Sequence, residues 1–359
     1  MNSKKLLILA GALAVAAVAV MLLDKQSGPS ISEKTALIPG LERDINNVAA
    51  ISVETSDESI RVERTAEGWV VASRDNYPAD LSKARELLVK LAEAKLLEAK
   101  TSKPENYAQL GVQSVDADDA DNLAIALDGV DSGTIIIGKT ATRGGPGTYV
   151  RRSDESQSWL ASGRITPPKT ALDWMQRDVI NVASADLSRV EVRPVDGTAY
   201  TLIKPSKEAF NFEVEPIPEG RELSAPSAGN GVAGILASIR FDDVRGAVDG
   251  AVAAGSMVFY SHHGMQVQLD ISTLDDSKWV AFSADYIAPE KAGDDDQNVE
   301  EVAADEPTEQ DVKAEVDRIN ASLAGWYYQL PSYKAGNLLK PLEDLLAPLP
   351  EEQGEELED

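Results

Sequence analysis

Apolar and polar residues alternate along much of the chain, and this spacing predicts β-strands. Ile60-Arg61-Val62-Glu63 and Val190-Glu191-Val192-Arg193 are clear examples, because successive side chains point to opposite faces of a strand. One face would pack on a core and the other would meet water, as in antiparallel sheets. Such strands are expected at residues 50–55, 59–64, 68–72, 123–127, 134–137, 148–152, 158–161, 190–194, 199–204, 211–214, 257–260, 265–269 and 278–282.

Helical spacing of apolar residues occurs at fewer places. Asp80 is a candidate N-cap for a helix whose apolar positions include Leu87, Leu88 and Leu91. A second helix is expected from about Gly229 to Ile239, and short helices at 171–179 and 338–346. Antiparallel sheets covered by such helices indicate an α+β fold.

The two halves of the chain repeat weakly, with a first copy at residues 48–180 and a second copy at 187–347. Strands and helices follow one another in the same order in both copies, and the offset between matched residues changes only at loops. We therefore expect two tandem repeats of one architecture. The matched pairs are Gly133 with Gly264, Tyr149 with Trp279, Trp159 with Trp326, and Trp69 with Phe212.

The first residues carry the longest apolar run of the chain. Residues 6–23 contain no charge and follow Lys4 and Lys5. As a helix they would span about 27 Å, close to the hydrocarbon core of a bilayer. The expectation is an N-terminal transmembrane anchor at 1–25, with its N-terminus in the cytoplasm, followed by a tether at 26–47. The alternative is a cleaved signal peptide, because the run also contains small-residue triplets of the A-x-A kind.

Composition narrows the functional classes. The chain has 359 residues, a net charge of −26 and 43% hydrophobic residues. That charge repels phosphate backbones and anionic lipid, so nucleic acid is excluded as a partner. The absence of cysteine excludes disulfides and thiolate chemistry. An acidic insertion at 290–311 is expected to be a mobile loop, and the acidic tail at 348–359 to be frayed.

Several short motifs together resemble the uncharacterised bacterial family catalogued as domain of unknown function 4340. The resemblance rests on the order of the motifs Trp69-Val70-Val71, Tyr77-Pro78-Ala79-Asp80, Tyr107-Ala108-Gln109-Leu110-Gly111-Val112, Ile137-Gly138-Lys139 and Tyr149-Val150-Arg151. It implies a protein anchored in the bacterial inner membrane with its main body in the periplasm. It also implies an accessory role beside an ABC transporter, and it brings no catalytic residues.

Two motifs suggest chemistry that their context does not favour. Residues 229–234 spell G-x-G-x-x-G, but no buried strand precedes them, so a glycine-rich helix start is expected rather than a dinucleotide site. His262 and His263 are the only histidines, and they are expected in a surface turn before Gly264. As neighbours in the chain they would point to opposite faces, which disfavours a shared metal. No G-x-S-x-G elbow accompanies them.

Carboxylates and tryptophans give weaker hints. The acids at 116–121 depart from a calcium loop at Ala120 and Asp121, and the run at 294–296 lacks the glycine turn. Asp242 and Asp243 could form a glycosidase pair only across a cleft that sequence does not define. The tryptophans matched between copies are expected to anchor the core rather than to bind sugar; they are Trp69, Trp159, Trp279 and Trp326.

Together these observations assign no catalytic, cofactor-binding or metal-binding residue, and they predict a protein that is not an enzyme. The expected function is a membrane-anchored envelope protein that serves as an accessory or scaffold subunit of an ABC-transporter-like membrane complex. The alternative is an extracytoplasmic module that binds a glycan or a peptide in a groove between the two copies, and a hydrolase is the third possibility.

Overall fold

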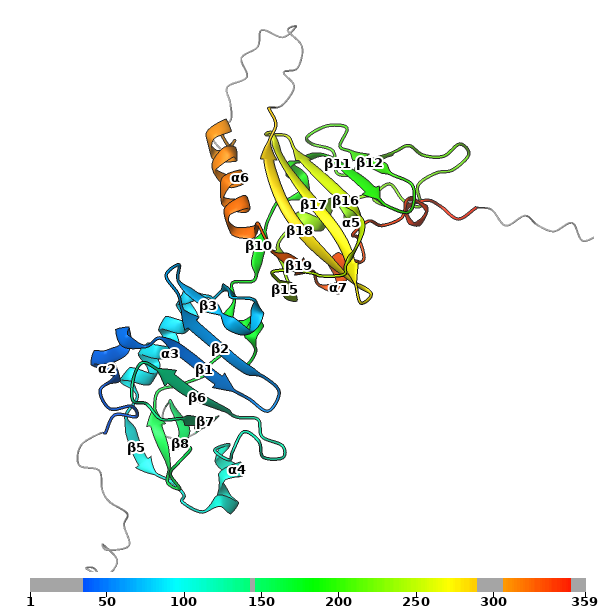
Figure 1. The fold of residues 1–359 in the computed structure, drawn as a ribbon. Coiled ribbons are helices and arrows are strands. Elements are labelled where there is room, and N and C mark those ends of the chain that lie inside the picture. The colour runs from blue at the N-terminus through cyan, green and yellow to red at the C-terminus, as the bar shows by residue number, and fades with distance from the viewer. Residues whose placement is uncertain (1–34, 143–145, 289–305, 350–359) are drawn as a thin grey trace, which may run out of the picture. The chain divides into compact units, whose positions relative to one another are not determined.

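The computed structural model describes residues 35–142, 146–288 and 306–349. They form two compact units, one ending at Met175 and the other starting at Gln176 (Figure 1). The anchor expected at 1–25, the start of the tether and the run at 294–296 lie outside these residues, as do most of the acidic tail and most of the acidic insertion. No helix within the described ranges is long and apolar enough to cross a membrane.

The first unit is built on a nine-stranded antiparallel sheet with strand order β4-β3-β2-β1-β6-β7-β8-β9-β5. Alternating burial along β2 places Ile60 and Val62 in the core and leaves Arg61 in water, as the alternation predicts. The strands are β1 (Ala50–Glu54), β2 (Ser59–Arg64), β3 (Trp69–Val71), β4 (Tyr77–Pro78), β5 (Leu96–Ala99), β6 (Leu123–Asp128), β7 (Ile135–Thr140), β8 (Gly147–Arg152) and β9 (Ser158–Ser162).

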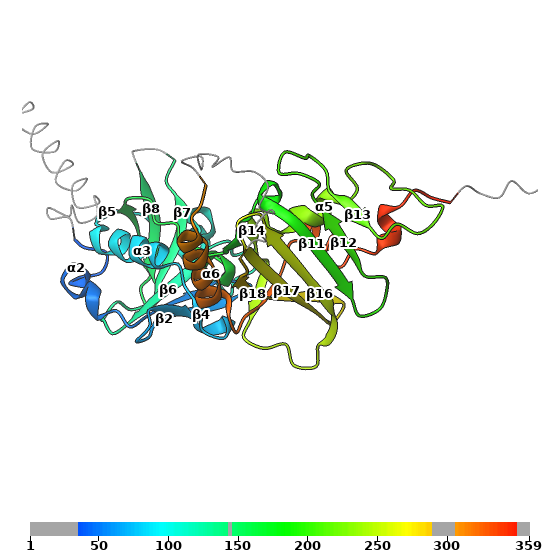
Figure 2. The same cartoon turned by 90° about the horizontal axis from the view of Figure 1, so that it is seen from above.

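Helix α3 (Leu81–Glu93) is the long helix of this unit and covers one face of the sheet (Figures 1 and 2). Asp80 is its N-cap as predicted, with the Ser82 amide donating to the Asp80 carboxylate at 2.9 Å. The shorter helices are α2 (Leu41–Asp44), η1 (Ile45–Asn47), η2 (Ala72–Arg74), η3 (Pro104–Asn106), α4 (Tyr107–Leu110) and η4 (Ala171–Trp174).

The segment expected to be a free tether is instead packed on the first unit from residue 36 onwards. Leu37, Ile38 and Leu41 are buried, and Ala36 forms a bridge with Lys95 next to β5. Leu41 follows Leu37 and Ile38 by four and three residues, and burial of the three apolar side chains favours the packed state of this segment. Residues 36–47 of the tether predicted at 26–47 are therefore part of the folded unit.

We expect Asp80→Ala to lower the free energy of unfolding of the first unit by about 1 kcal/mol, the usual cost of losing an N-cap. The hydroxyl of Ser82 also donates to Asp80, and this bond is the main reason why the pKa of Asp80 is lowered. A lowered pKa means that the stabilisation is present above the unfolded-state pKa and is lost as pH falls through the folded-state pKa.

Urea unfolding of both proteins at neutral and acidic pH measures this difference. Asp116→Ala, at an exposed aspartate of the same unit without a partner among the described residues, is the control. We expect it to stay within about 0.5 kcal/mol of the parent protein. An equal loss in the two variants would contradict the capping role.

The second unit is built on an eight-stranded antiparallel sheet with strand order β13-β12-β11-β16-β17-β18-β19-β15, and a two-stranded ladder pairs β10 with β14. The long strands β16 to β18 form its centre (Figure 1). The strands are β10 (Asp178–Ile180), β11 (Leu187–Pro194), β12 (Tyr200–Ile203), β13 (Glu213–Glu215), β14 (Ile239–Arg240), β15 (Asp243–Arg245), β16 (Val252–Ser261), β17 (Met265–Leu274), β18 (Ser277–Tyr286) and β19 (Tyr327–Gln329).

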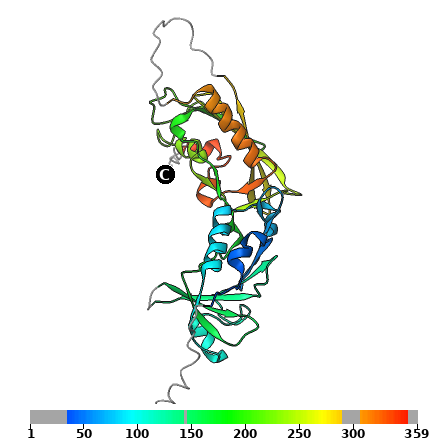
Figure 3. The same cartoon turned by 90° about the vertical axis from the view of Figure 1, so that its left-hand side faces the viewer.

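Helix α6 (Glu309–Leu323) lies along β18, as Figure 3 shows in orange beside the yellow strands. Its side chains Val312, Val316, Ile319 and Leu323 are buried. The last residues of the predicted acidic loop at 290–311 are thus the first turn of a helix that sequence analysis missed. The remaining helices are η5 (Ser184–Asp186), α5 (Asn230–Ala233), η6 (Gly234–Leu236), α7 (Ser332–Ala335) and η7 (Leu342–Leu345).

The two sheets share one topology. β1 lies between β2 and β6, as β11 lies between β12 and β16, and β5 and β15 each pair with the last strand of the following meander. Each unit also closes with a 3-10 turn whose last carbonyl accepts a backbone N–H. Asp80 donates to Trp174 at 2.7 Å, and Ser224 donates to Leu345 at 2.9 Å. In Figure 2 the red C-terminal turn accordingly lies beside α5 and β13.

The boundary between the units differs from the predicted one. Residues 178–180, which were placed at the end of the first copy, form β10 and pair with β14. They therefore belong to the second unit. The side chain of Arg177 adds to this attachment, because its Nε donates to the Phe241 carbonyl at 2.8 Å.

The predicted fold class is wrong. We expected an α+β fold, with a transmembrane helix followed by sheets and packed helices. The described residues are mostly antiparallel sheet with 23% helix, and no described helix could span a membrane. Glycines at 229, 231 and 234 favour helix poorly, so the second helix shrinks to α5 and η6 although Val232, Ile235 and Leu236 are buried. The short helices expected at 171–179 and 338–346 are each a single 3-10 turn, η4 and η7.

Candidate functional site

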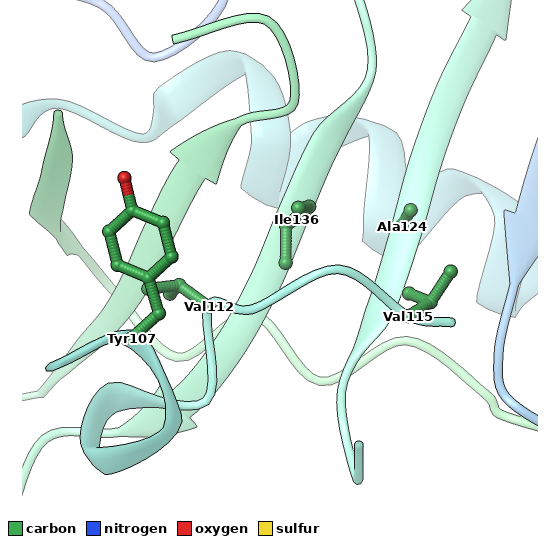
Figure 4. Packing of buried hydrophobic residues seen from close by; sticks show 5 residues of the cluster. All are labelled: Tyr107, Val112, Val115, Ala124 and Ile136. Atoms are coloured by element: carbon green, nitrogen blue, oxygen red, sulfur yellow. The ribbon is translucent and has the colours of Figure 1, made fainter. Parts of the chain in front are cut away.

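Three of the five motifs behind the family resemblance, at residues 107–112, 137–139 and 149–151, meet at one cluster of the first unit. Tyr107, Val112 and Val115 pack on Ala124 of β6 and Ile136 of β7 (Figure 4). All five lie within residues 107–136, and the β6–β7 pairing places Ala124 opposite Ile136. The cluster is a small apolar core beneath α4.

Polar groups lock the same cluster. The Arg151 side chain is buried; its Nε donates to the Val112 carbonyl at 2.9 Å, and its guanidinium lies 4.6 Å from the Tyr107 ring centre. Tyr107 donates to the Ser156 carbonyl at 2.5 Å, and Lys139 Nζ donates to the Ala108 carbonyl at 3.1 Å. The cationic groups here donate to backbone carbonyls, so these three motifs hold the fold together at this cluster.

An apolar groove of about 300 Å³ opens on the first unit between η1, β2, β3 and α3. We call it the Trp69 groove. Trp69, Ala84 and Leu88 form its buried floor. Leu81 and Val89, one at the first and one at the last part of α3, are 49% and 39% exposed at its rim. Both side chains therefore lie at the edge of the Trp69 groove.

The rim of the Trp69 groove carries positive charge. Arg64 lies over the Trp69 ring at 5.2 Å and donates to the Asn46 carbonyl at 3.0 Å. Arg85 lines the groove and has no ion-pair partner within residues 35–142, 146–288 and 306–349. No acidic side chain lines the groove in this part of the chain. In a chain of net charge −26 this is an unusual place, apolar at the floor and cationic at the edge.

The two histidines occupy the turn between β16 and β17 that the sequence predicts, and they line different hollows. His262 lines one hollow, of about 620 Å³, together with Arg189 and Tyr260. His263 lines another, of about 250 Å³, together with Asp311 and Glu315 of α6. We call these the His262 hollow and the His263 hollow. Each lies on the second unit.

The surroundings of His262 favour its neutral form. Burial lowers its pKa, and the positive charges of Lys204, Lys207 and His263 lower it further against the opposing effect of Asp186. Its Nε2 atom is buried and has no hydrogen-bond partner among the residues that the structure describes. Its backbone N–H donates to the Asp186 carbonyl at 2.9 Å, which fixes the turn.

The glycine-rich motif begins a helix, as predicted. Gly229 is the N-cap residue of α5, and β13 ends at Glu215, so residues 216–228 separate the motif from the nearest preceding strand. A Cβ at Gly229 would lie 2.9 Å from Leu202 Cδ2, which gives this glycine a packing reason. The strand-turn-helix context of a dinucleotide site is not present.

The acidic candidates do not assemble into a site. Asp121 pairs with Lys169, while Asp116, Asp118 and Asp119 are exposed. Asp242 pairs with Arg177 at 2.9 Å. Across the described ranges no group of three or more potential ligands could hold a metal ion.

The matched tryptophans differ in burial. Trp69 and Trp279 are buried as the core-anchor prediction requires, whereas Trp159 and Trp326 are half-buried. Arg245 lies 4.5 Å from the Trp279 ring centre and covers its face. The fifth tryptophan, Trp174, is fully buried and was missed as a core residue.

Sequence analysis named no site residue for either the Trp69 groove or the His262 hollow. Part of the signal was present for the groove, because Leu81 and Val89 lie outside the buried stripe of α3. The hollow had no such signal, since Arg189 and His262 are far apart in the chain and meet only through the pairing of β11 with β16.

The described architecture is that of a tandem β-sheet protein with one topology used twice. The chain belongs to the family described as domain of unknown function (DUF4340), whose profile matches residues 69–254. This confirms the resemblance drawn from the motifs. Comparisons with curated proteins and with solved structures gave no match.

Proposed function

We propose that this chain is a non-catalytic accessory subunit of an ABC-transporter-like membrane complex at the bacterial inner membrane, with its folded units outside the cytosol. We further propose that the Trp69 groove is where the first unit receives its partner. The apolar stretch at residues 6–23 supports the location, and the groove carries the docking proposal.

The partner segment can be described by its chemistry. Exposed Leu81 and Val89 lose contact with water when an apolar side chain enters the groove, and each fully buried residue of this size contributes about 1.5–3 kcal/mol. Arg64 and Arg85 complement carboxylates on either side of that side chain. We therefore infer a short apolar segment flanked by Asp or Glu, carried by a transporter-type membrane protein.

Site-specific crosslinking tests the proposal. A photoreactive amino acid is placed at position 81 of the full chain in living cells, and the crosslinked peptide is identified by mass spectrometry. We expect a membrane-complex subunit, with the crosslink on an apolar segment beside carboxylates. Arg85→Glu should weaken crosslinking about tenfold, and reversing the charge of the partner's flanking residue should restore it.

The matched control is a probe at Leu97 of β5, which is 41% exposed but does not line the groove. A partner captured equally from positions 81 and 97, or captured without sensitivity to Arg85→Glu, would contradict the docking role. Crosslinks only to soluble proteins would contradict the accessory function itself.

A further inference from the structure

The His262 hollow on the second unit differs from the acidic composition of the chain in the charge of its described lining residues. It lies where β16 and β18 end and where β11 and β17 begin, and its volume is about 620 Å³. Its described lining residues include Arg189 and His262 and no carboxylate. The whole chain carries 60 acidic against 34 basic residues, so a hollow of this size whose described lining residues include no carboxylate needs a reason.

Hydrogen-bond donors are available at the hollow. Ser261 Oγ accepts from the backbone N–H of His263 at 3.3 Å and of Met265 at 2.9 Å. Its hydroxyl hydrogen has no acceptor in the described part of the chain, so it can donate outward. Ser188 is different, because its hydroxyl already donates to the Tyr260 carbonyl at 3.1 Å.

The guanidinium of Arg189 is held in place. It lies 4.1 Å from the Tyr260 ring centre and 3.3 Å from the Glu191 carboxylate. Glu191 also pairs with Arg193, so two guanidiniums share one carboxylate and one positive charge remains. A stacked, tethered guanidinium loses little entropy when it binds an anion through its remaining N–H groups.

Lys204 contributes a further positive charge near the hollow. Lys204 is nearly buried, and its Nζ donates to the Ala185 carbonyl at 3.0 Å. Carbonyls satisfy its hydrogen bonds but do not neutralise its charge. Lys207 lies nearby and is paired with Glu306. The lining also has an apolar part, formed by Met265, Ile287 and Ala288.

We propose that the His262 hollow binds a small organic anion, with its carboxylate or phosphate group against Arg189 and Ser261 and its apolar body against Met265 and Ile287. The site lies on the second unit and does not depend on the Trp69 groove. His262 makes no direct bond to the anion in this proposal, because its Nε2 is buried; it responds to the anion's charge.

Protonation of His262 and binding of the anion are linked. An anion in the hollow stabilises the imidazolium and raises the lowered pKa of His262, and by reciprocity anion affinity rises as pH falls through that pKa. The groups that set this response are Lys204, Lys207 and His263, which oppose protonation, and Asp186 and Glu208, which favour it.

NMR of the imidazole nitrogens tests the site directly in the full chain. Only two histidines exist, so His263→Asn assigns the signals. Butyrate and butyl phosphate are titrated at constant ionic strength, with butylammonium and inorganic phosphate as comparisons. We expect both organic anions to raise the apparent pKa of His262 and butylammonium to leave it unchanged. Comparing the affinities of butyrate and butyl phosphate shows whether a carboxylate or a phosphate headgroup is preferred.

Arg189→Gln should weaken organic-anion binding about tenfold, the size of a lost charge-assisted hydrogen bond. Arg193→Gln is the matched control, because Arg193 shares Glu191 but does not line the hollow, and it should change affinity less than about twofold. Equal losses in both variants, no response of His262 to either organic anion, or inorganic phosphate binding as well as both, would each overturn the proposal.

Discussion

Trp174→Ala should destabilise the first unit by about 3–5 kcal/mol, the range for removing a fully buried tryptophan. The Trp174 side chain has no exposed surface and lies in η4, the turn that closes the unit. Its backbone carbonyl receives the N–H of Asp80 at the start of α3. A cavity at this place removes the packing that holds the turn against the residue where α3 begins.

Hydrogen exchange followed by mass spectrometry measures this loss unit by unit, which matters because a chain with two compact units need not unfold in one step. Leu345→Ala is the matched variant, since Leu345 is buried in η7 and its carbonyl accepts from Ser224 in the corresponding way. We expect it to destabilise the second unit by about 2–5 kcal/mol. Faster exchange in the same segments for both variants would contradict the assignment of each turn to its own unit.

The alternation of apolar and polar residues predicted the strands well, because residues two apart lie on the same face of a strand and are buried or exposed together. β2 begins and ends at the predicted residues, and β6 extends the prediction by one residue at Asp128. The N-cap at Asp80 was predictable for a related reason, since its side chain accepts hydrogen bonds from Ser82, only two residues away. Strand positions and the helix cap depend on residues close in the sequence and could therefore be predicted from it.

Two helices of the second unit were predicted wrongly, one because of its acidic surroundings and the other because of its glycines. Helix α6 begins directly after an acidic run, yet Thr308 and Asp311 form a capping box and Val312, Val316 and Ile319 follow helical spacing. The acidic composition hid this signal. Conversely, apolar spacing at 229–239 predicted a helix where three glycines allow only single turns.

The hollows could not be predicted because their residues converge through sheet pairing. Arg189 faces Tyr260 across the β11–β16 ladder, and His262 follows at the end of β16. Their register is set by long-range pairing with a bulge between Leu187 and Arg189, which a single sequence does not specify. The predicted surface turn before Gly264 needed only local sequence, and the two histidines lie between β16 and β17 as expected.

Gly138 in β7 lies against the backbone of the motif at residues 107–112. A Cβ at this position would lie 2.4 Å from the Leu110 carbonyl oxygen and 2.8 Å from that of Gly111. These are backbone atoms, so no side-chain rotation can relieve the overlap. The chain after α4 can approach β7 this closely only where the strand has no side chain.

Gly138→Ala is therefore expected to lower the stability of the first unit by about 3 kcal/mol, at the upper end for overpacking. The displaced segment 107–112 would also lose its bonds to Lys139 and Arg151. Gly234→Ala is the matched control, because nothing lies within 4 Å of its added Cβ. At that helical position we expect no loss, or a gain of up to about 1 kcal/mol. Urea unfolding gives the magnitudes, and hydrogen exchange at 107–112 locates the effect. If Gly138→Ala left the exchange of that segment unchanged, close backbone approach would not be the reason for this glycine.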